Sequence, residues 1–191
     1  KHGKLAVLFF MTVIYFYHEL KKDKNPTPGI EVVTNLKFLP VNGDNIAYKA
    51  AELLKEEFHI SEGVRITLKK HIPVAAGLAG GSSNAAAVLF GMNWMFRLGL
   101  SRKSLMERGV KLGADVPYCI MRGTVLAEGI GEELRTLPAM PKCTVLIAKP
   151  PVSVSTKTVY EALDSKEIVE HPDIDGIIDG REQHNLRQIA S

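Results

Sequence analysis

The feature that most constrains the fold is the run 64–99, where a strand pattern passes through a glycine cluster into a helix pattern. Apolar and polar side chains alternate from Val64 to Leu68, the period of a strand with one wet face. Beyond Ser83 the apolar side chains recur every three or four residues and form one helical stripe ending near Gly99: Ala85, Val88, Leu89, Met92, Met95 and Phe96. We therefore predict the order strand, glycine loop, helix.

The glycine loop has the composition of a phosphate-binding turn. Three glycines fall within five positions and two serines follow them: Gly77, Gly80, Gly81, Ser82 and Ser83. Glycine allows positive φ angles and lets a ligand approach the backbone closely. The free N–H groups and the positive dipole end of the following helix point at whatever the loop holds. The alternative is a tight turn in which a serine caps the helix.

Other glycine motifs fit this stretch less well. A Walker loop would carry a lysine after its last glycine, but Ser82 follows Gly81. The dinucleotide fingerprint would follow a first parallel strand and precede an acidic residue by about 20 positions. A hydrolase elbow reads G-x-S-x-G, whereas Asn84 and Ala85 follow the serines. A nucleophilic serine is therefore not predicted.

The other elements follow from apolar spacing and turn residues. An amphipathic helix runs from Ile46 to Phe58, capped by Asp44 or Asn45. Further strands and helices are predicted as follows: a strand through 13–16 and a charged turn at 21–29, a strand at 30–34, a helix at 102–112 capped by Ser101, a turn at 115–117, strands at 118–126 and 144–149, a short helix from Thr156 to Leu163, and a helical region after Pro172.

Composition excludes several classes of protein. The 191 residues are 46% hydrophobic with a net charge of +3, which predicts a globular chain without the basic block of a nucleic-acid binder. Leu5 to Tyr17 is shorter than the roughly 20 residues of a membrane helix, so we read it as a buried strand or, alternatively, a signal-like segment. Cys119 and Cys143 form no CxxC pair, which argues against zinc and indicates a reducing, cytoplasmic setting.

Three stretches carry a resemblance to a known family: "IPVAAGLAGGSSNAAAVL", "LGADVPYCI" and "AKPPVSVSTKTVYEALD". In this order they resemble successive motifs of the GHMP small-molecule kinases, and the similarity runs from about Gly29 to about Asp164. The resemblance implies an α+β, ribosomal protein S5 domain 2-like N-terminal domain over residues 1–150. Residues 151–191 would then be a linker and the start of an incomplete second α+β subdomain, so that the chain would be a kinase core lacking part of both ends.

The resemblance also implies a reaction. It implies transfer of phosphate from ATP, with Mg²⁺, to the 2-hydroxyl of 4-diphosphocytidyl-2-C-methyl-D-erythritol in the non-mevalonate isoprenoid pathway. Two alternatives stay open: another GHMP kinase of the homoserine or mevalonate type, or a non-catalytic remnant that binds nucleotide. The partners expected are ATP and a small molecule, with no nucleic acid or membrane, and the chain is expected to be a monomer or homodimer.

The residue roles implied by the resemblance centre on Asp115, in "GADVP", as the catalytic carboxylate that accepts a proton from the substrate hydroxyl or orients it. The alternative is a helix-stop or turn residue. Thr156 and His18 would contact the substrate, although Thr156 could be only a helix cap. On another register of the first strands, Lys4, Tyr17 and His18 are not site residues. Ser82, or Ser83, would contact Mg²⁺. The expected ATP-binding residues are Asn45, Lys70 (or a solvated strand end), Pro73, Val74, Ala75, Ala76, Gly77, Leu78, Ala79, Gly80, Gly81, Ser82 and Ser83.

Overall fold

The computed structural model describes residues 18–22, 29–74, 76–144, 146, 156–165, 173–183 and 185–189. The segment Leu5–Tyr17, for which we expected a buried strand, lies outside the described residues, as do Lys4 and Ala75. The expected boundary at residue 150 also falls outside them. Within the described part, no helix is both long enough and apolar enough to cross a bilayer.

Three strands form a mixed sheet in the order β1-β3-β2. They are β1 (His18–Lys22), β2 (Ile30–Thr34) and β3 (Val64–Leu68). β3 pairs parallel to β2 and antiparallel to β1. The predicted strands at 30–34 and 64–68 are confirmed. The turn predicted to begin at Lys21 is wrong at its start, because Lys21 and Lys22 still pair with β3.

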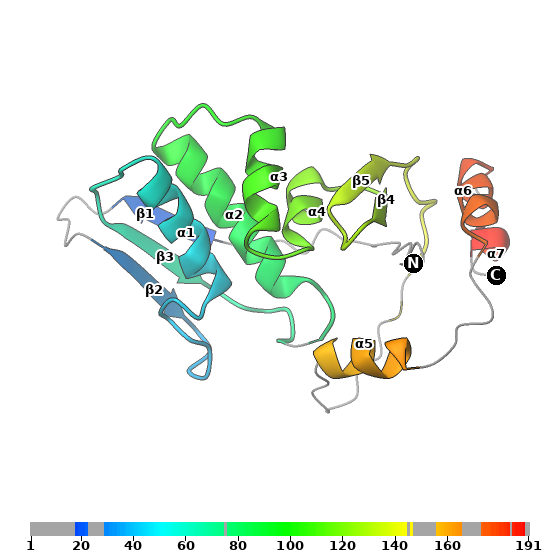
Figure 1. The fold of residues 1–191 in the computed structure, drawn as a ribbon, viewed down its shortest axis with the longest axis horizontal. Coiled ribbons are helices and arrows are strands. Elements are labelled where there is room, and N and C mark those ends of the chain that lie inside the picture. The colour runs from blue at the N-terminus through cyan, green and yellow to red at the C-terminus, as the bar shows by residue number, and fades with distance from the viewer. Residues whose placement is uncertain are drawn as a thin grey trace.

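Two long helices cover one face of this sheet (Figure 1). α1 (Ile46–Glu57) contacts β2 and β3, α2 (Gly80–Met95) contacts β1, and the two helices pack against each other. Leu54, Ile66 and Leu89 are fully buried between them. Each such side chain contributes about 1.5–3 kcal/mol through burial. The amphipathic helix is confirmed and Asn45 caps it, since its Oδ1 accepts from the Ala47 N–H at 2.9 Å.

The next region departs from the prediction. α3 (Arg102–Val110) begins after Ser101 as expected, but α4 (Val116–Met121) replaces the first part of the strand predicted over 118–126. Pro117 lies in the first turn of α4, where its missing N–H costs nothing. All four residues from Val116 to Cys119 are buried, and an apolar run buried on every side does not distinguish helix from strand. Of the region predicted as a strand, the part that is extended belongs to β4 (Val125–Glu128). This strand pairs antiparallel with β5 (Glu133–Thr136), which we did not predict.

The last described elements are helical: α5 (Thr156–Asp164), α6 (Ile174–Glu182) and α7 (Leu186–Ile189). The helices predicted from Thr156 and after Pro172 are confirmed. Thr144 and Leu146 are not in a strand, contrary to the strand predicted at 144–149, whose other residues are not described. The buried Arg181 of α6 donates to the Pro138 carbonyl and contacts Met140 Sδ at 3.7 Å, which ties α6 to the segment after β5.

Candidate functional site

A cavity of about 350 Å³ opens between the loop that follows β2 and the glycine-rich turn before α2. Most of its wall is apolar, and its polar side chains are Asp44 and Asn45 before α1, Lys70 beyond β3 and Asn84 in α2. The lining residues are Leu39, Pro40, Asp44, Asn45, Ile46, Leu68, Lys70, Pro73, Val74, Ala76, Gly77, Leu78, Ala79, Gly80, Gly81 and Asn84. The structure therefore places three of the predicted groups around one cavity: Asn45, Lys70 and most of the glycine-rich turn.

The glycine-rich turn is shorter than predicted, because α2 already begins at Gly80 and its first turn contains Ser82. Gly77 has φ +67° and Ala79 has φ 49°, so the chain passes through two left-handed residues just before the helix. The first intrahelical bond runs from the Ser83 N–H to the Ala79 carbonyl at 2.9 Å. Within the described part of the chain, no carbonyl accepts from the N–H groups of Gly80, Gly81 and Ser82. These amides are available to an anionic ligand.

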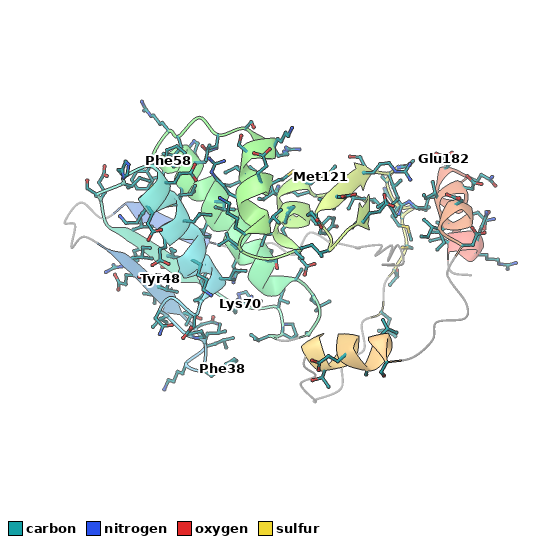
Figure 2. The ribbon with its side chains drawn as sticks, viewed as in Figure 1. Phe38, Tyr48, Phe58, Lys70, Met121 and Glu182 are labelled. Carbon is teal, nitrogen blue, oxygen red and sulfur yellow. The ribbon has the colours of Figure 1, made fainter. Side chains whose placement is uncertain are left out.

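Lys70 lies beneath this first turn (Figure 2). Its Nζ donates to the Gly80 carbonyl at 2.8 Å, and only 8% of the residue is exposed. The Asn84 amide is assigned with its oxygen toward Lys70, because only then do both of its polar atoms find partners: Nζ at 3.2 Å and the Gly80 carbonyl at 3.1 Å. Burial lowers the pKa of the Lys70 ammonium below its usual range. Lys70 therefore holds the turn from inside rather than standing as a solvated strand end.

The opposite wall is the loop between β2 and α1, which Asn45 closes. Besides capping α1, Asn45 donates from Nδ2 to the Pro40 carbonyl at 2.7 Å. Both ends of the Asn45 side chain are thus used to shape the wall. Phe38 projects from the outer edge of this loop with 71% of its surface exposed (Figure 2).

A residue we did not predict closes the other end of this loop. The Asn35 side chain accepts from the Lys70 N–H at 2.8 Å and donates to the Lys70 carbonyl at 3.1 Å. The sequence gives one weak signal for it, an asparagine directly after a strand, where side chains often bond to the backbone.

Asp115 lies at the N-cap position of α4 and is half-buried. It does not line the cavity, but the two are linked by Ile46: a Cβ on Gly81 would lie 3.6 Å from Ile46 Cγ2, and one on Gly113 would lie 3.7 Å from Ile46 Cδ1. The segment just before Asp115 and the first turn of α2 therefore lie against the same side chain. Burial raises the pKa of the Asp115 carboxyl above its ordinary range.

The two serines differ in their surroundings. The Ser83 hydroxyl donates to the Gly80 carbonyl at 3.2 Å, whereas Ser82 is half-buried in the first turn. No three His, Cys, Asp or Glu side chains converge on a metal position among the described residues. The serine hydroxyls are oxygen donors, the kind of ligand that Mg²⁺ prefers.

The two expected substrate residues lie on other elements. His18 is the first residue of β1 and pairs with Leu68, which lines the cavity, so its backbone runs beside the site. Thr156 is the first residue of α5. The side chains of both lie outside the described part of the structure.

The fold and cavity together define an α+β domain in which a helix N-terminus borders a cavity, and comparisons with known proteins give the family. The sequence-family model of the GHMP kinases N terminal domain matches residues 45–123 of this chain. Over 191 residues the chain is 50% identical to the 4-diphosphocytidyl-2-C-methyl-D-erythritol kinase of Lachnospira eligens, covering all of this chain and 66% of that protein. The same-named protein of Clostridium botulinum is 45% identical over 99% of this chain and 67% of its own length. This chain belongs to the GHMP kinase family.

Solved structures agree with this assignment. A 4-(cytidine 5'-diphospho)-2C-methyl-D-erythritol kinase matches with a TM-score of 0.64 and 28% identity, over 87% of this chain and 57% of that chain. A homoserine kinase from Cytophaga hutchinsonii shares the fold, with a TM-score of 0.69 at 20% identity, over 89% of this chain and 59% of that chain. The predicted α+β class and family resemblance are therefore confirmed. The chain spans 66% of the length of the Lachnospira eligens relative and 65% of the length of the same-named protein of Lachnoclostridium phytofermentans.

Proposed function

We propose that this chain binds ATP in the cavity and transfers its γ-phosphate to the 2-hydroxyl of 4-diphosphocytidyl-2-C-methyl-D-erythritol. The observation that carries the proposal is that, among the described residues, no carbonyl accepts from the N–H groups of Gly80, Gly81 and Ser82, which begin a 16-residue helix whose first two residues line the cavity. Such a helix start favours phosphate through its dipole and its free donors together. The substrate follows from the names of the relatives at 45–53% identity.

The cavity has two halves that suit the two ends of a nucleotide. Leu39, Pro40 and Val74 give it an apolar wall against which a base ring can lie, while the first turn of α2 supplies donors for phosphate oxygens. Its volume of about 350 Å³ lies within the usual size of small-molecule sites. The left-handed residues Gly77 and Ala79, which also line the cavity, turn the backbone directly before these donors.

Asp115 is the proposed catalytic residue. Its carboxylate would orient the substrate hydroxyl, or accept the proton of that hydroxyl, as the hydroxyl oxygen approaches the γ-phosphorus. The bond formed is from the substrate oxygen to phosphorus, and the bond broken joins the γ-phosphorus to the oxygen retained by ADP. The raised pKa of Asp115 supports a role as a proton acceptor, because a more basic carboxylate takes a proton more readily.

The remaining roles concern the metal and the acceptor. Mg²⁺ bound with the nucleotide, with Ser82 as its expected protein ligand, would offset the negative charge of the phosphates. We propose that Thr156 and His18 contact the cytidylyl substrate, His18 from the strand beside Leu68. A metabolic enzyme of this kind would work in the cytoplasm.

A substrate panel tests the proposal. ADP release from MgATP is measured with the 191-residue chain and three acceptors: the cytidylyl alcohol, homoserine and mevalonate. We expect turnover with the cytidylyl alcohol alone. Phosphorylation of homoserine or mevalonate in its place would contradict the proposed substrate, and failure to bind MgATP at millimolar concentration would contradict the proposed site.

The Asp115→Asn variant separates catalysis from binding. It keeps the size of the side chain but removes the proton acceptor, so kcat should fall by about 10²–10⁴-fold. The Kd for MgATP should stay within about threefold, because Asp115 does not line the cavity. Unchanged turnover in this variant would remove Asp115 from the mechanism.

A further inference from the structure

Asn35 extends the pairing of β2 with β3 by means of its side chain. Its backbone N–H makes a long bond of 3.4 Å to the Leu68 carbonyl. Beyond this point the side-chain amide replaces the main chain: Oδ1 accepts from the Lys70 N–H at 2.8 Å and Nδ2 donates to the Lys70 carbonyl at 3.1 Å. One side chain thus satisfies both backbone groups of Lys70, as a further strand residue would.

Because the Asn35 side chain takes the place of a backbone partner for Lys70, the main chain after Thr34 can leave the sheet. The Thr34 hydroxyl accepts from the Leu36 N–H at 3.2 Å, and the Leu36 carbonyl accepts from the Leu39 N–H at 3.1 Å, which together form a tight turn. The turn carries Leu39 and Pro40 over the cavity, where they form its apolar wall. Asn35 therefore fixes the start of this wall.

The same contacts fix the other wall. Lys70 lies two residues beyond the end of β3, and the Asn35 side chain bonds to both its N–H and its carbonyl. With that backbone held by Asn35, the Lys70 ammonium reaches the Gly80 carbonyl at 2.8 Å. The carbonyl belongs to the first turn of α2, whose residues Gly80 and Gly81 line the cavity. Asn35, Lys70 and Gly80 thus form one continuous path from the β2 loop to that turn.

We propose that Asn35 is a positioning residue of the nucleotide site, which sets the spacing between the apolar wall and the phosphate-binding turn through the backbone of Lys70. The role rests on the proposed function, because it concerns how that cavity holds ATP. Asn35 itself does not line the cavity, so its effect reaches the ligand through Lys70 and Leu39.

The chain contains a matched control. Asn93 makes the same pair of bonds to Leu100, donating to its carbonyl at 3.0 Å and accepting from its N–H at 2.9 Å. It lies thirteen residues from Gly80 along α2, which is roughly 20 Å of helix. Asn93→Ala therefore removes an equal backbone clamp at a distance from the cavity.

Two measurements compare Asn35→Ala with Asn93→Ala. In calorimetric titration with MgATP, the Kd should rise about tenfold for Asn35→Ala and stay within twofold of the wild type for Asn93→Ala. In the second measurement, each protein without ligand is briefly acetylated with acetic anhydride, and the modified fraction of Lys70 is read by mass spectrometry. Relative to the wild type, this fraction should increase at least threefold in Asn35→Ala and should not increase in Asn93→Ala. Both variants should lower the thermal midpoint. If Asn35→Ala does not fold, Asn35→Asp, which keeps an acceptor but loses the donor, should shift both readouts in the same direction.

The outcomes distinguish this role from the proposed function. If wild-type protein does not bind MgATP, the nucleotide site and the role of Asn35 both fail. If wild-type protein binds but the Asn35 variant has a Kd within twofold of the wild type, the positioning role alone fails. Equal weakening by Asn93→Ala would also overturn it, because the loss would then follow general stability.

Discussion

The Nζ atom of Lys70 lies 2.8 Å from the carbonyl oxygen of Gly80, ten residues further along the chain. A buried ammonium that donates to the first turn of a helix holds that turn in place, and Gly80 and Gly81 of the turn line the cavity. Glycine leaves room for this contact: a Cβ at position 80 would lie 3.0 Å from the Lys70 Nζ and 3.3 Å from Ile72 Cγ2, both tighter than ordinary van der Waals contact. Gly80 therefore both leaves room for the Lys70 contact and lines the candidate ligand-binding cavity.

Gly80→Ala and Gly81→Ala should have opposite effects on stability. At position 80 the new methyl group displaces the Lys70 ammonium or Ile72, and such overpacking costs about 1–3 kcal/mol. At position 81 it meets Ile46 Cγ2 at an ordinary 3.6 Å, and alanine gains up to about 1 kcal/mol in helix propensity. Urea unfolding of the two variants measures the difference, and equal stability would contradict the crowding at Gly80.

Much of the fold was predictable because its central elements are half-buried. Val64–Leu68 alternates and the helix Ile46–Glu57 is amphipathic, so the periodicity reports the face that packs on the core. The failure at Tyr118–Met121 has the opposite cause: these residues are buried almost all round, and only packing against neighbouring helices decides their conformation.

The candidate site was predictable only in part, for a related reason. The cluster of glycines predicts the turn directly from the local sequence. Asn35, in contrast, acts through two hydrogen bonds to Lys70, a residue 35 positions away. No local spacing encodes such a contact. The buried hydrogen bond of Lys70 was likewise not predictable, because a lysine at the end of a strand is usually solvated.

The proposed role of Asp115 predicts a pH dependence. The carboxylate must be ionised to accept a proton, and burial raises its pKa. The acid limb of the kcat profile should therefore lie above the pH near 4 at which an exposed aspartate titrates. MgATP affinity measured over the same range is the control. A kcat that falls only where MgATP binding falls would assign the limb to the nucleotide.

Asp115 should also cost stability at neutral pH. Because its pKa is raised in the folded chain, the native state binds more protons than the unfolded state between the two pKa values. The free energy of unfolding contributed by this group therefore falls as the pH rises through that window, and the loss is complete above the folded pKa. Asp115→Asn should raise the thermal midpoint at pH 7.

A paired measurement at low pH provides the control for that prediction. At a pH below both pKa values, wild-type Asp115 is neutral in both states, and the stabilising effect of Asp115→Asn should disappear. Equal shifts in the thermal midpoint at both pH values would show that the effect of the substitution comes from hydrogen bonding or packing rather than from the buried charge.

The two thiols should react at very different rates. Burial, assisted by the negative charge of Asp115, raises the pKa of Cys119 to about 12, so that at pH 8 only about 10⁻⁴ of it is thiolate. Cys143 is exposed. Native protein treated with a disulfide reagent such as dithionitrobenzoate should release one rapid equivalent of chromophore, and Cys143→Ser should abolish that phase. Urea should then expose Cys119 and release one equivalent from this variant. A rapid phase that persists in native Cys143→Ser protein would mean that Cys119 is accessible, and the packing of α4 against α2 would have to be revised.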